Sequence, residues 1–170
     1  IRGILGTYED ITKSKQMEAM LNASEAKYRI VADNTYDWEY WVSPEGRFLY
    51  TSPSCQRITG YAASEFEADP GLMMRIVHPD DRPMVAAHGG QDQKACATRE
   101  FEFRVLHRDG TIRWVGHVCQ SVFDSSGCYL GRRGSNRDIS DRKKAEEALK
   151  ESARKLKLFA YSVAHDLKRS

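Results

Sequence analysis

The stretch TREFEFRVLHRDGTIRWVGHVCQSVF, residues 98–123, decides the predicted fold. Apolar and polar residues alternate on both sides of Asp109-Gly110. Alternation with a period of two is typical of a strand with one buried face, and Asp-Gly is a preferred pair for a tight hairpin turn. The stretch therefore predicts two long antiparallel strands joined at Asp109-Gly110.

Shorter segments on both sides extend this hairpin into a sheet. Residues 37–42 and 47–51 alternate around a polar turn, and a further strand is expected over residues 128–138. Glycine and proline interrupt residues 55–90, which predicts several short helices there. The order of elements predicts an α+β fold, with a five-stranded antiparallel sheet and short helices on one face.

The composition argues against several classes of function. The formal net charge is +2 and no dense basic stripe appears, so we expect no nucleic-acid binding. The cysteines form no CxxC pair, which predicts neither a metal site nor a disulfide framework and fits a reducing, cytoplasmic compartment; they are Cys55, Cys96, Cys119 and Cys128. No run of about 18 apolar residues exists, so we expect no membrane span in this chain.

A segment near the start of the chain resembles one near its end. GILGTYEDITKSKQMEAML, residues 3–21, matches GRRGSNRDISDRKKAEEAL, residues 131–149, at a constant offset of 128. Each copy is predicted to be a glycine-containing strand followed by a charged helix, capped by Thr12 in the first copy and Ser140 in the second. A fixed repeat predicts that the same module ends twice. Two unrelated strand-to-helix junctions are the alternative.

The repeat divides the chain into four predicted parts. We expect residues 1–12 to end a preceding module of the same kind, and residues 13–32 to form a linker helix. Residues 33–140 are predicted to form one complete module, and residues 141–170 a signalling helix. Because the chain starts and stops within these patterns, we expect it to be a piece of a longer protein.

Short motifs within residues 33–140 resemble those of PAS domains. The motifs are Gly60-Tyr61, His78-Pro79-Asp80-Asp81, Asp109-Gly110 followed by Trp114, Asp124 to Gly127, and Asp138-Ile139-Ser140. They follow the order and spacing of that family. The resemblance implies a PAS fold and a sensor role. It leaves the ligand open, because PAS domains hold flavin, haem, small acids or nothing.

We expect neither flavin nor haem, and the sequence identifies no cofactor-binding residue. Light-sensing flavin members of the family carry a reactive cysteine after the Gly-Tyr position, whereas Cys55 precedes it. Haem requires an axial imidazole that faces the cavity. His88 lies in the relevant stretch and is interpreted as a surface residue at a helix end. His117 shares a strand face with Cys119, either as a cavity wall or as a hydrogen-bonded sheet histidine.

The C-terminal segment predicts a long helix that pairs with a second copy. Asp141 to Ser170 contain no glycine or proline. Apolar residues recur at spacings of four and three, the heptad pattern of coiled coils; they are Leu149, Ala153, Leu156, Ala160, Val163 and Leu167. A similar pattern lies in residues 13–32. We therefore expect a homodimer formed through both flanking helices.

The heptad places His165 at position f, on the face turned away from the predicted helix contact. A neutral imidazole is a good nucleophile near pH 7. The stretch FAYSVAHDLKRS, residues 159–170, resembles the phosphoacceptor box of sensor histidine kinases in two-component systems. The resemblance implies that His165 takes phosphate from ATP and passes it to a response regulator, with Asp166 as base or orienting residue. A chance surface histidine on a coiled-coil helix is the alternative.

The predicted kinase activity needs a further domain. The sequence contains no glycine-rich P-loop motif, so we expect an ATP-binding domain of the same protein to supply ATP and the chain alone to be inactive. The alternative function is a PAS module for dimerisation or ligand binding in another signalling protein, without a kinase output.

Overall fold

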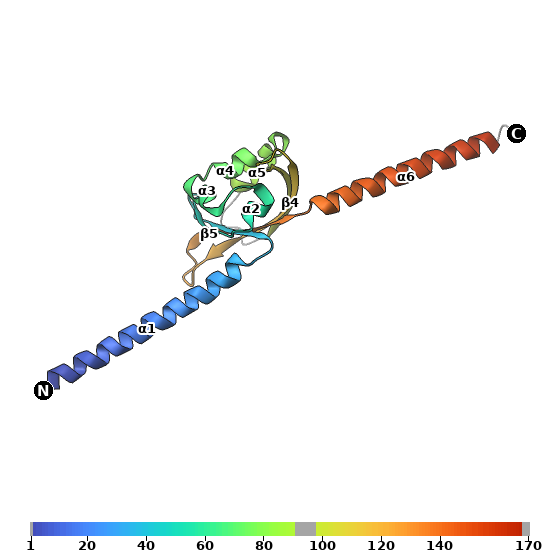
Figure 1. Ribbon diagram of the computed structural model, residues 1–170. Coiled ribbons are helices and arrows are strands. Elements are labelled where there is room, and N and C mark those ends of the chain that lie inside the picture. Colours follow the sequence, from blue (N-terminus) through green and yellow to red (C-terminus); the bar gives the residue numbers. More distant parts are fainter. Residues whose placement is uncertain (1, 91–97, 168–170) are drawn as a thin grey trace.

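The computed structural model describes residues 2–90 and 98–167. They form an α+β fold, in which short helices cover one face of a five-stranded antiparallel sheet and a long helix lies at each end (Figure 1). In chain order the elements are α1 (Arg2–Asp33), β1 (Trp38–Val42), β2 (Phe48–Thr51), α2 (Cys55–Thr59), α3 (Ala63–Ala68), α4 (Leu72–Ile76), the 3-10 helix η1 (Pro79–Asp81), α5 (Arg82–Gly90), β3 (Arg99–Leu106), β4 (Ile112–Phe123), β5 (Tyr129–Asp138) and α6 (Ser140–Leu167). The predicted fold class is confirmed.

The strands lie in the order β2-β1-β5-β4-β3, and each neighbouring pair is antiparallel. Both predicted hairpins are present, as β1–β2 and β3–β4. The last strand, β5, pairs with β1 on one side and with β4 on the other. It therefore lies at the centre of the sheet and joins the two hairpins.

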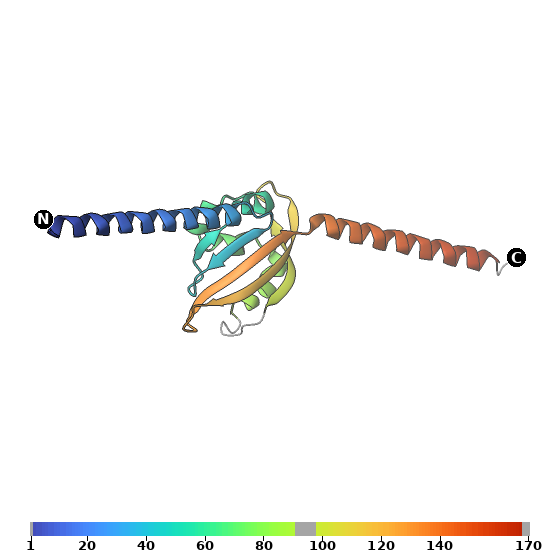
Figure 2. The same cartoon turned by 90° about the horizontal axis from the view of Figure 1, so that it is seen from below.

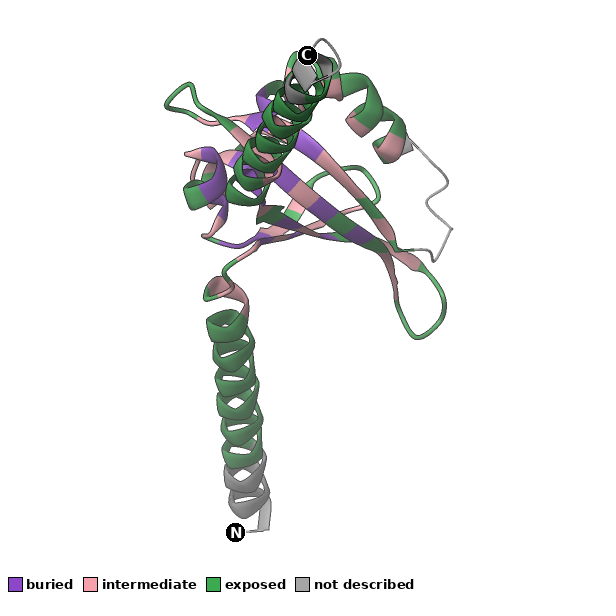
Figure 3. Cartoon of the chain, turned by 90° about the vertical axis from the view of Figure 1, so that its right-hand side faces the viewer, coloured by how far each residue is buried: buried purple, intermediate pink, exposed green. Residues whose placement is uncertain are grey.

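The hydrophobic core lies between the sheet and the short helices (Figure 3). Trp38 on β1, Phe103 on β3, Val115 on β4 and Phe66 on α3 are almost completely buried. Successive strand residues point to opposite faces, so the alternation in the sequence becomes one buried face and one exposed face. As predicted, residues 55–90 form only short helices, and these cover the buried face.

The two long helices leave the sheet on opposite sides (Figures 1 and 2). Residues 11–31 of α1 are exposed throughout, and so are most described side chains of α6 (Figure 3). No helix in the described part of the chain is both long and apolar enough to cross a membrane.

The first copy of the repeat does not form the strand that the sequence predicts. Residues 3–12 belong to α1, whereas their counterparts, residues 131–140, form β5 and the start of α6. A strand needs a neighbour for its backbone hydrogen bonds, and none of the described strands pairs with residues 3–12. A helix satisfies those groups within itself. The strand prediction is wrong for this chain, and the assignment of residues 1–12 to a preceding module stays a prediction.

The start of α6 is tied to β4 through Trp114. Its backbone carbonyl accepts a hydrogen bond from the Ile139 N–H at 2.9 Å, and its own N–H donates to the Ser140 hydroxyl, also at 2.9 Å. The Asp138 carboxylate accepts a hydrogen bond from the Ser140 N–H at 2.9 Å. The Asp138 side chain therefore caps the start of α6, the role that was predicted for Ser140. The Ser140 hydroxyl instead connects the helix to the sheet.

Candidate functional site

A cavity of about 400 Å³ lies between the buried face of the sheet and the helices α4 and α5. Its wall is largely aromatic and aliphatic, and includes Tyr40, Phe48, Met73, Val85, Phe101 and Phe103. The polar groups that reach it include His88, His117 and Arg132. A concave apolar site with a few convergent polar groups is the usual form of a small-molecule site.

Close packing of Tyr40 against the sheet shapes one wall of this cavity. The Tyr40 ring lies directly over Gly134 of β5, where any Cβ atom would overlap the ring. Tyr40 also stacks on His117, with ring centroids 6.2 Å apart and planes 18° from parallel. The glycine that the repeat places at position 134 is therefore required by this contact.

His117 occupies the middle of the cavity's sheet wall. On β4 it pairs with Phe101 of β3 and with Asn136 of β5. Its Nδ1 lies 2.8 Å from the Asn136 Oδ1. Because a carboxamide oxygen only accepts hydrogen bonds, Nδ1 carries the proton and Nε2 carries the lone pair. That Nε2 is buried and has no hydrogen-bond partner.

His88 reaches the same place from α5. Its ring centroid is 4.6 Å from that of Phe101 and 5.2 Å from that of His117. Its Nε2 lies 3.1 Å from the Cys119 Sγ, on the next inward-facing position of β4 after His117. The interpretation of His88 as a surface residue is therefore wrong. The end of helix α5 brings His88 against Phe101 and Cys119 on the buried face of the sheet, a placement that local sequence does not encode.

Burial sets the protonation states of these groups. It lowers the pKa of His88 to about 4, and repulsion from His117, when that ring is protonated, and from Arg132 acts in the same direction. Burial likewise lowers the pKa of His117, although the hydrogen bond with Asn136 acts in the opposite direction. Burial raises the pKa of the Cys119 thiol. At neutral pH the cluster thus holds two neutral imidazoles and one protonated thiol.

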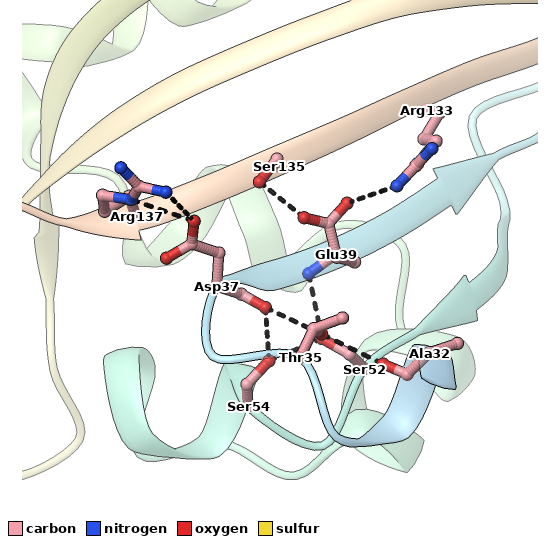
Figure 4. Close-up of polar contacts among 9 residues, drawn as sticks. All are labelled: Ala32, Thr35, Asp37, Glu39, Ser52, Ser54, Arg133, Ser135 and Arg137. Carbon is pink, nitrogen blue, oxygen red and sulfur yellow. Dashed lines mark hydrogen bonds and ion pairs between the residues drawn. The ribbon is translucent and has the colours of Figure 1, made fainter. Parts of the chain in front are cut away.

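Polar contacts join the end of α1 and the segment that follows it to strand β5 (Figure 4). The Thr35 hydroxyl lies 3.0 and 3.1 Å from the carbonyls of Ala32 and Asp37, which share its one proton. The Asp37 carboxylate accepts two hydrogen bonds from the Arg137 guanidinium, at 2.7 and 2.9 Å. Arg137 lies next to the last residue of β5, so the exit of α1 is linked to the strand that leads into α6.

A second contact group binds β1 to β5 a few residues away (Figure 4). The Glu39 carboxylate accepts a hydrogen bond from the Ser135 hydroxyl at 2.7 Å and pairs with Arg133 at 3.3 Å. The Glu39 N–H donates to the Ser52 hydroxyl at 2.9 Å. None of these charged side chains lines the cavity next to His88 and His117. Asp37, Ser135 and Arg137 instead line a second cavity, of about 500 Å³.

Comparison with known proteins identifies the fold family. A family model described as "PAS fold" matches residues 48–135, more than half of the chain. The chain belongs to the PAS fold family.

Relatives of this PAS domain include a kinase and a protein of unknown role. It is 34% identical over 143 residues to the uncharacterized protein y4lL of Sinorhizobium fredii, and the match covers 84% of this chain and 17% of y4lL. It is 26% identical over 126 residues to sporulation kinase C of Bacillus subtilis, covering 74% of this chain and 28% of the kinase. The chain therefore spans only a small part of these relatives.

A solved structure gives the same fold. A sensory box histidine kinase/response regulator from Burkholderia thailandensis is 27% identical, with a TM-score of 0.58, and the match covers 77% of this chain and 98% of that one. The named kinases connect this PAS domain to sensor-kinase relatives.

Two further histidines and a tryptophan have structural roles in the PAS domain. His78 accepts a hydrogen bond from the Asp80 N–H at its Nδ1, at 3.3 Å. His107 lies 2.9 Å from the Asp109 carboxylate, at the β3–β4 turn. Trp38 is completely buried, and its indole N–H donates to the Thr51 hydroxyl at 2.7 Å.

The predicted phosphoacceptor lies on α6, far along the chain from the cavity. The backbone of His165 and Asp166 is helical, within Ser140–Leu167. Their side chains, and all of residues 168–170, lie outside what the structure describes. The roles given to His165 and Asp166 stay predictions.

The cluster of His88, His117 and Cys119 is the main feature that sequence reasoning missed. The alternation of β4 did place His117 and Cys119 on one face. Nothing in the local sequence placed His88 opposite them, because that contact depends on how α5 packs on the sheet.

Proposed function

We propose that this PAS domain is the signal-sensing part of a sensor histidine kinase and controls phosphorylation of His165. One observation carries the proposal. Strand β4 lines the cavity through His117. Three residues earlier, both backbone groups of Trp114 bind Ile139 and Ser140, at the junction between β5 and α6. A ligand that shifts β4 would therefore act directly on the base of the helix that carries His165.

The exposed apolar stripe of α6 supports pairing with a second copy. Leu149 and Leu156 are 72% and 68% exposed, and Ala153 and Ala160 lie on the same stripe. A helix with this much unpaired apolar surface is stabilised mainly by burying it against another helix. In a parallel dimer of this kind, the f position of His165 points outward, where an ATP-binding domain and a response regulator can reach it.

The proposed signal is a change in how the two α6 helices pack. Packed helix interfaces have a few discrete arrangements, and a ligand shifts the balance only through its different affinity for them. The contact of Trp114 with Ser140 and that of Arg137 with Asp37 would allow β4 and β5 to transmit such a shift to the long helices. Activity of the whole protein then depends on what occupies the cavity.

Incubation of the protein encoded by the complete reading frame with labelled ATP tests this function. We expect acid-labile, base-stable phosphate on the wild-type protein and none on His165→Gln. Ser162→Ala and Tyr161→Phe, on exposed positions of the same helix, are matched controls for hydroxyl phosphorylation and should keep the label. The 170-residue chain alone should take up no phosphate from ATP.

Two results would overturn the proposal. Wild-type levels of acid-labile phosphate on His165→Gln would remove the role of that residue. A reading frame whose output domain is not a kinase, combined with no histidine phosphate, would favour the other function, a PAS module that serves dimerisation or ligand binding.

A further inference from the structure

Three side chains with metal-binding atoms converge at the sheet wall of the cavity. His88 comes from α5, while His117 and Cys119 come from alternate positions of β4. The candidate ligand atoms, one from each residue, all lie within 4.8 Å of one another. His117 and Cys119 are buried and His88 is half-buried, so the group is largely shielded from bulk water.

The unpartnered nitrogen of His117 is the second observation. Its Nδ1–H is taken by Asn136, which fixes the tautomer and leaves a lone pair on the buried Nε2. Buried polar atoms in folded proteins nearly always have a partner. Metal-bound imidazoles usually donate their other N–H to a neighbouring oxygen, as His117 does to Asn136. His117 thus has the arrangement of a metal ligand whose outer contact is already formed.

A thiol–imidazole hydrogen bond is the simpler explanation for part of the cluster. The Cys119 Sγ and the His88 Nε2 are 3.1 Å apart, and this contact satisfies both. It leaves the His117 Nε2 without a partner. A bound ion would engage all three atoms, so it accounts for one more buried group than the hydrogen bond does.

The donor set selects the class of ion. Two imidazole nitrogens and one thiolate suit soft or borderline ions, whereas Mg²⁺ and Ca²⁺ need oxygen ligands. The Arg132 guanidinium, which donates to the His88 carbonyl at 3.2 Å, adds positive charge close by. A thiolate balances Cu⁺ in full. Zn²⁺ would retain one positive charge and take a fourth ligand, for which the adjoining cavity has room.

We propose that His88, His117 and Cys119 bind a thiophilic d10 metal ion, Cu⁺ or Zn²⁺, through Nε2, Nε2 and Sγ. Binding breaks the S–H bond of Cys119 and forms a metal–sulfur bond, and the thiol proton passes to solvent, so one proton is released per ion. No electron is transferred. This site does not depend on the kinase function proposed above, because metal binding is measured without ATP.

Competition with chromophoric chelators on the 170-residue chain tests the site. Zn²⁺ is added in one arm and Cu⁺, under anaerobic and reducing conditions, in the other. We expect one ion per chain in at least one arm, and the tighter arm identifies the ion. Cys119→Ser and His88→Gln should each weaken binding by more than about tenfold. Removing only the hydrogen-bond partner of a metal ligand already weakens binding by about tenfold or more, and each of these changes removes a ligand itself.

The other thiols provide matched controls. Cys128→Ser, at an exposed turn position, and Cys96→Ser should bind like the wild type. Co²⁺ in place of Zn²⁺ should give a sulfur-to-metal charge-transfer band that Cys119→Ser lacks. The ion should also raise the melting temperature of the wild type, but not that of the Cys119 variant.

Equal binding of both ions by the wild type and His88→Gln would overturn the proposal, as would binding that disappears in Cys128→Ser or Cys96→Ser instead. Absence of binding in both arms would do the same. Circular dichroism without metal checks that each variant is folded. If Cys119→Ser does not fold, His88→Gln decides the question alone, because His88 is half-buried and lies near the end of a short helix.

Discussion

The two copies of the sequence repeat fold differently. Residues 131–149 form strand β5, a tight junction and the start of α6, while residues 3–21 lie within one continuous helix, α1. The residues that match include Gly6 and Gly134, and Ile11 and Ile139. Similar residues therefore do not fix the local structure here.

The difference lies in the neighbours. β5 is held on both sides, by β1 and by β4, so every second residue faces a core. Residues 3–12 have no such partner among the described strands, and the helical form closes their hydrogen bonds locally. Substituting the same position in both copies separates what the tertiary context contributes from what the residue itself contributes.

The largest effect is expected at the isoleucine pair. Ile139 is 8% exposed and packs over Gly116, whereas Ile11 is 51% exposed on α1. Ile139→Ala should lower the free energy of unfolding by about 2–4 kcal/mol, through lost burial and the cavity left behind. Ile11→Ala should change it by less than about 0.5 kcal/mol. Urea unfolding followed by tryptophan fluorescence measures both, and equal losses would mean that the two positions share one environment.

A smaller effect is expected at the glycine pair, where the two substitutions should act in opposite directions. A Cβ at position 134 would overlap the Tyr40 ring, so Gly134→Ala should cost about 1–3 kcal/mol through overpacking. Gly6 is helical, and alanine has a helix propensity better than that of glycine by about 1 kcal/mol.

Thermal unfolding and far-UV circular dichroism test this pair together. Gly134→Ala should lower the melting temperature, whereas Gly6→Ala should raise helix content and leave the melting of the sheet domain unchanged. If Gly6→Ala destabilises the protein as Gly134→Ala does, residues 3–12 form a strand in solution and the prediction made from the repeat was correct.

The sequence was sufficient for the sheet and insufficient for the first helix. Asp109-Gly110 and the alternation around it determine the long hairpin, because both the turn and the strand period are local signals. The glycines of residues 3–12 carried the same local signal as those of β5, and only the presence or absence of pairing strands distinguishes the two copies.

The candidate site shows the same limit. Alternation along β4 was enough to place His117 beside Cys119, since residues two apart on a strand share a face. The approach of His88 to Cys119 depends on how α5, the last of several short helices, packs on the sheet. No periodic pattern in residues 55–90 encodes that packing. His165 was assigned from a heptad and a motif alone, and its side chain remains beyond the described part of the chain.

The smallest effect is expected at the ion pairs that link α6, within the second copy of the repeat, to the sheet. The carboxylate of Glu102 on β3 pairs with Lys143 and Arg142 of α6, and hydrogen bonds from these two lower its pKa. The counterparts of these cations, Ser14 and Lys15, lie exposed on α1. Glu102→Gln should cost no more than about 1 kcal/mol at pH 7, because the side chain is 36% exposed and solvent screens the pairs.

The pH dependence of this effect follows from the lowered pKa. The contribution of Glu102 is present above the usual glutamate pKa of about 4.3 and is lost as the pH falls through its lower folded value. The free energies of unfolding of the wild type and Glu102→Gln should therefore differ at pH 7 and converge toward pH 3. Glu100→Gln, two residues earlier on the same strand face, is the matched control and should change little at either pH. A difference that persists at low pH would show that Glu102 holds α6 through packing, and that charge does not tie the helix to the sheet.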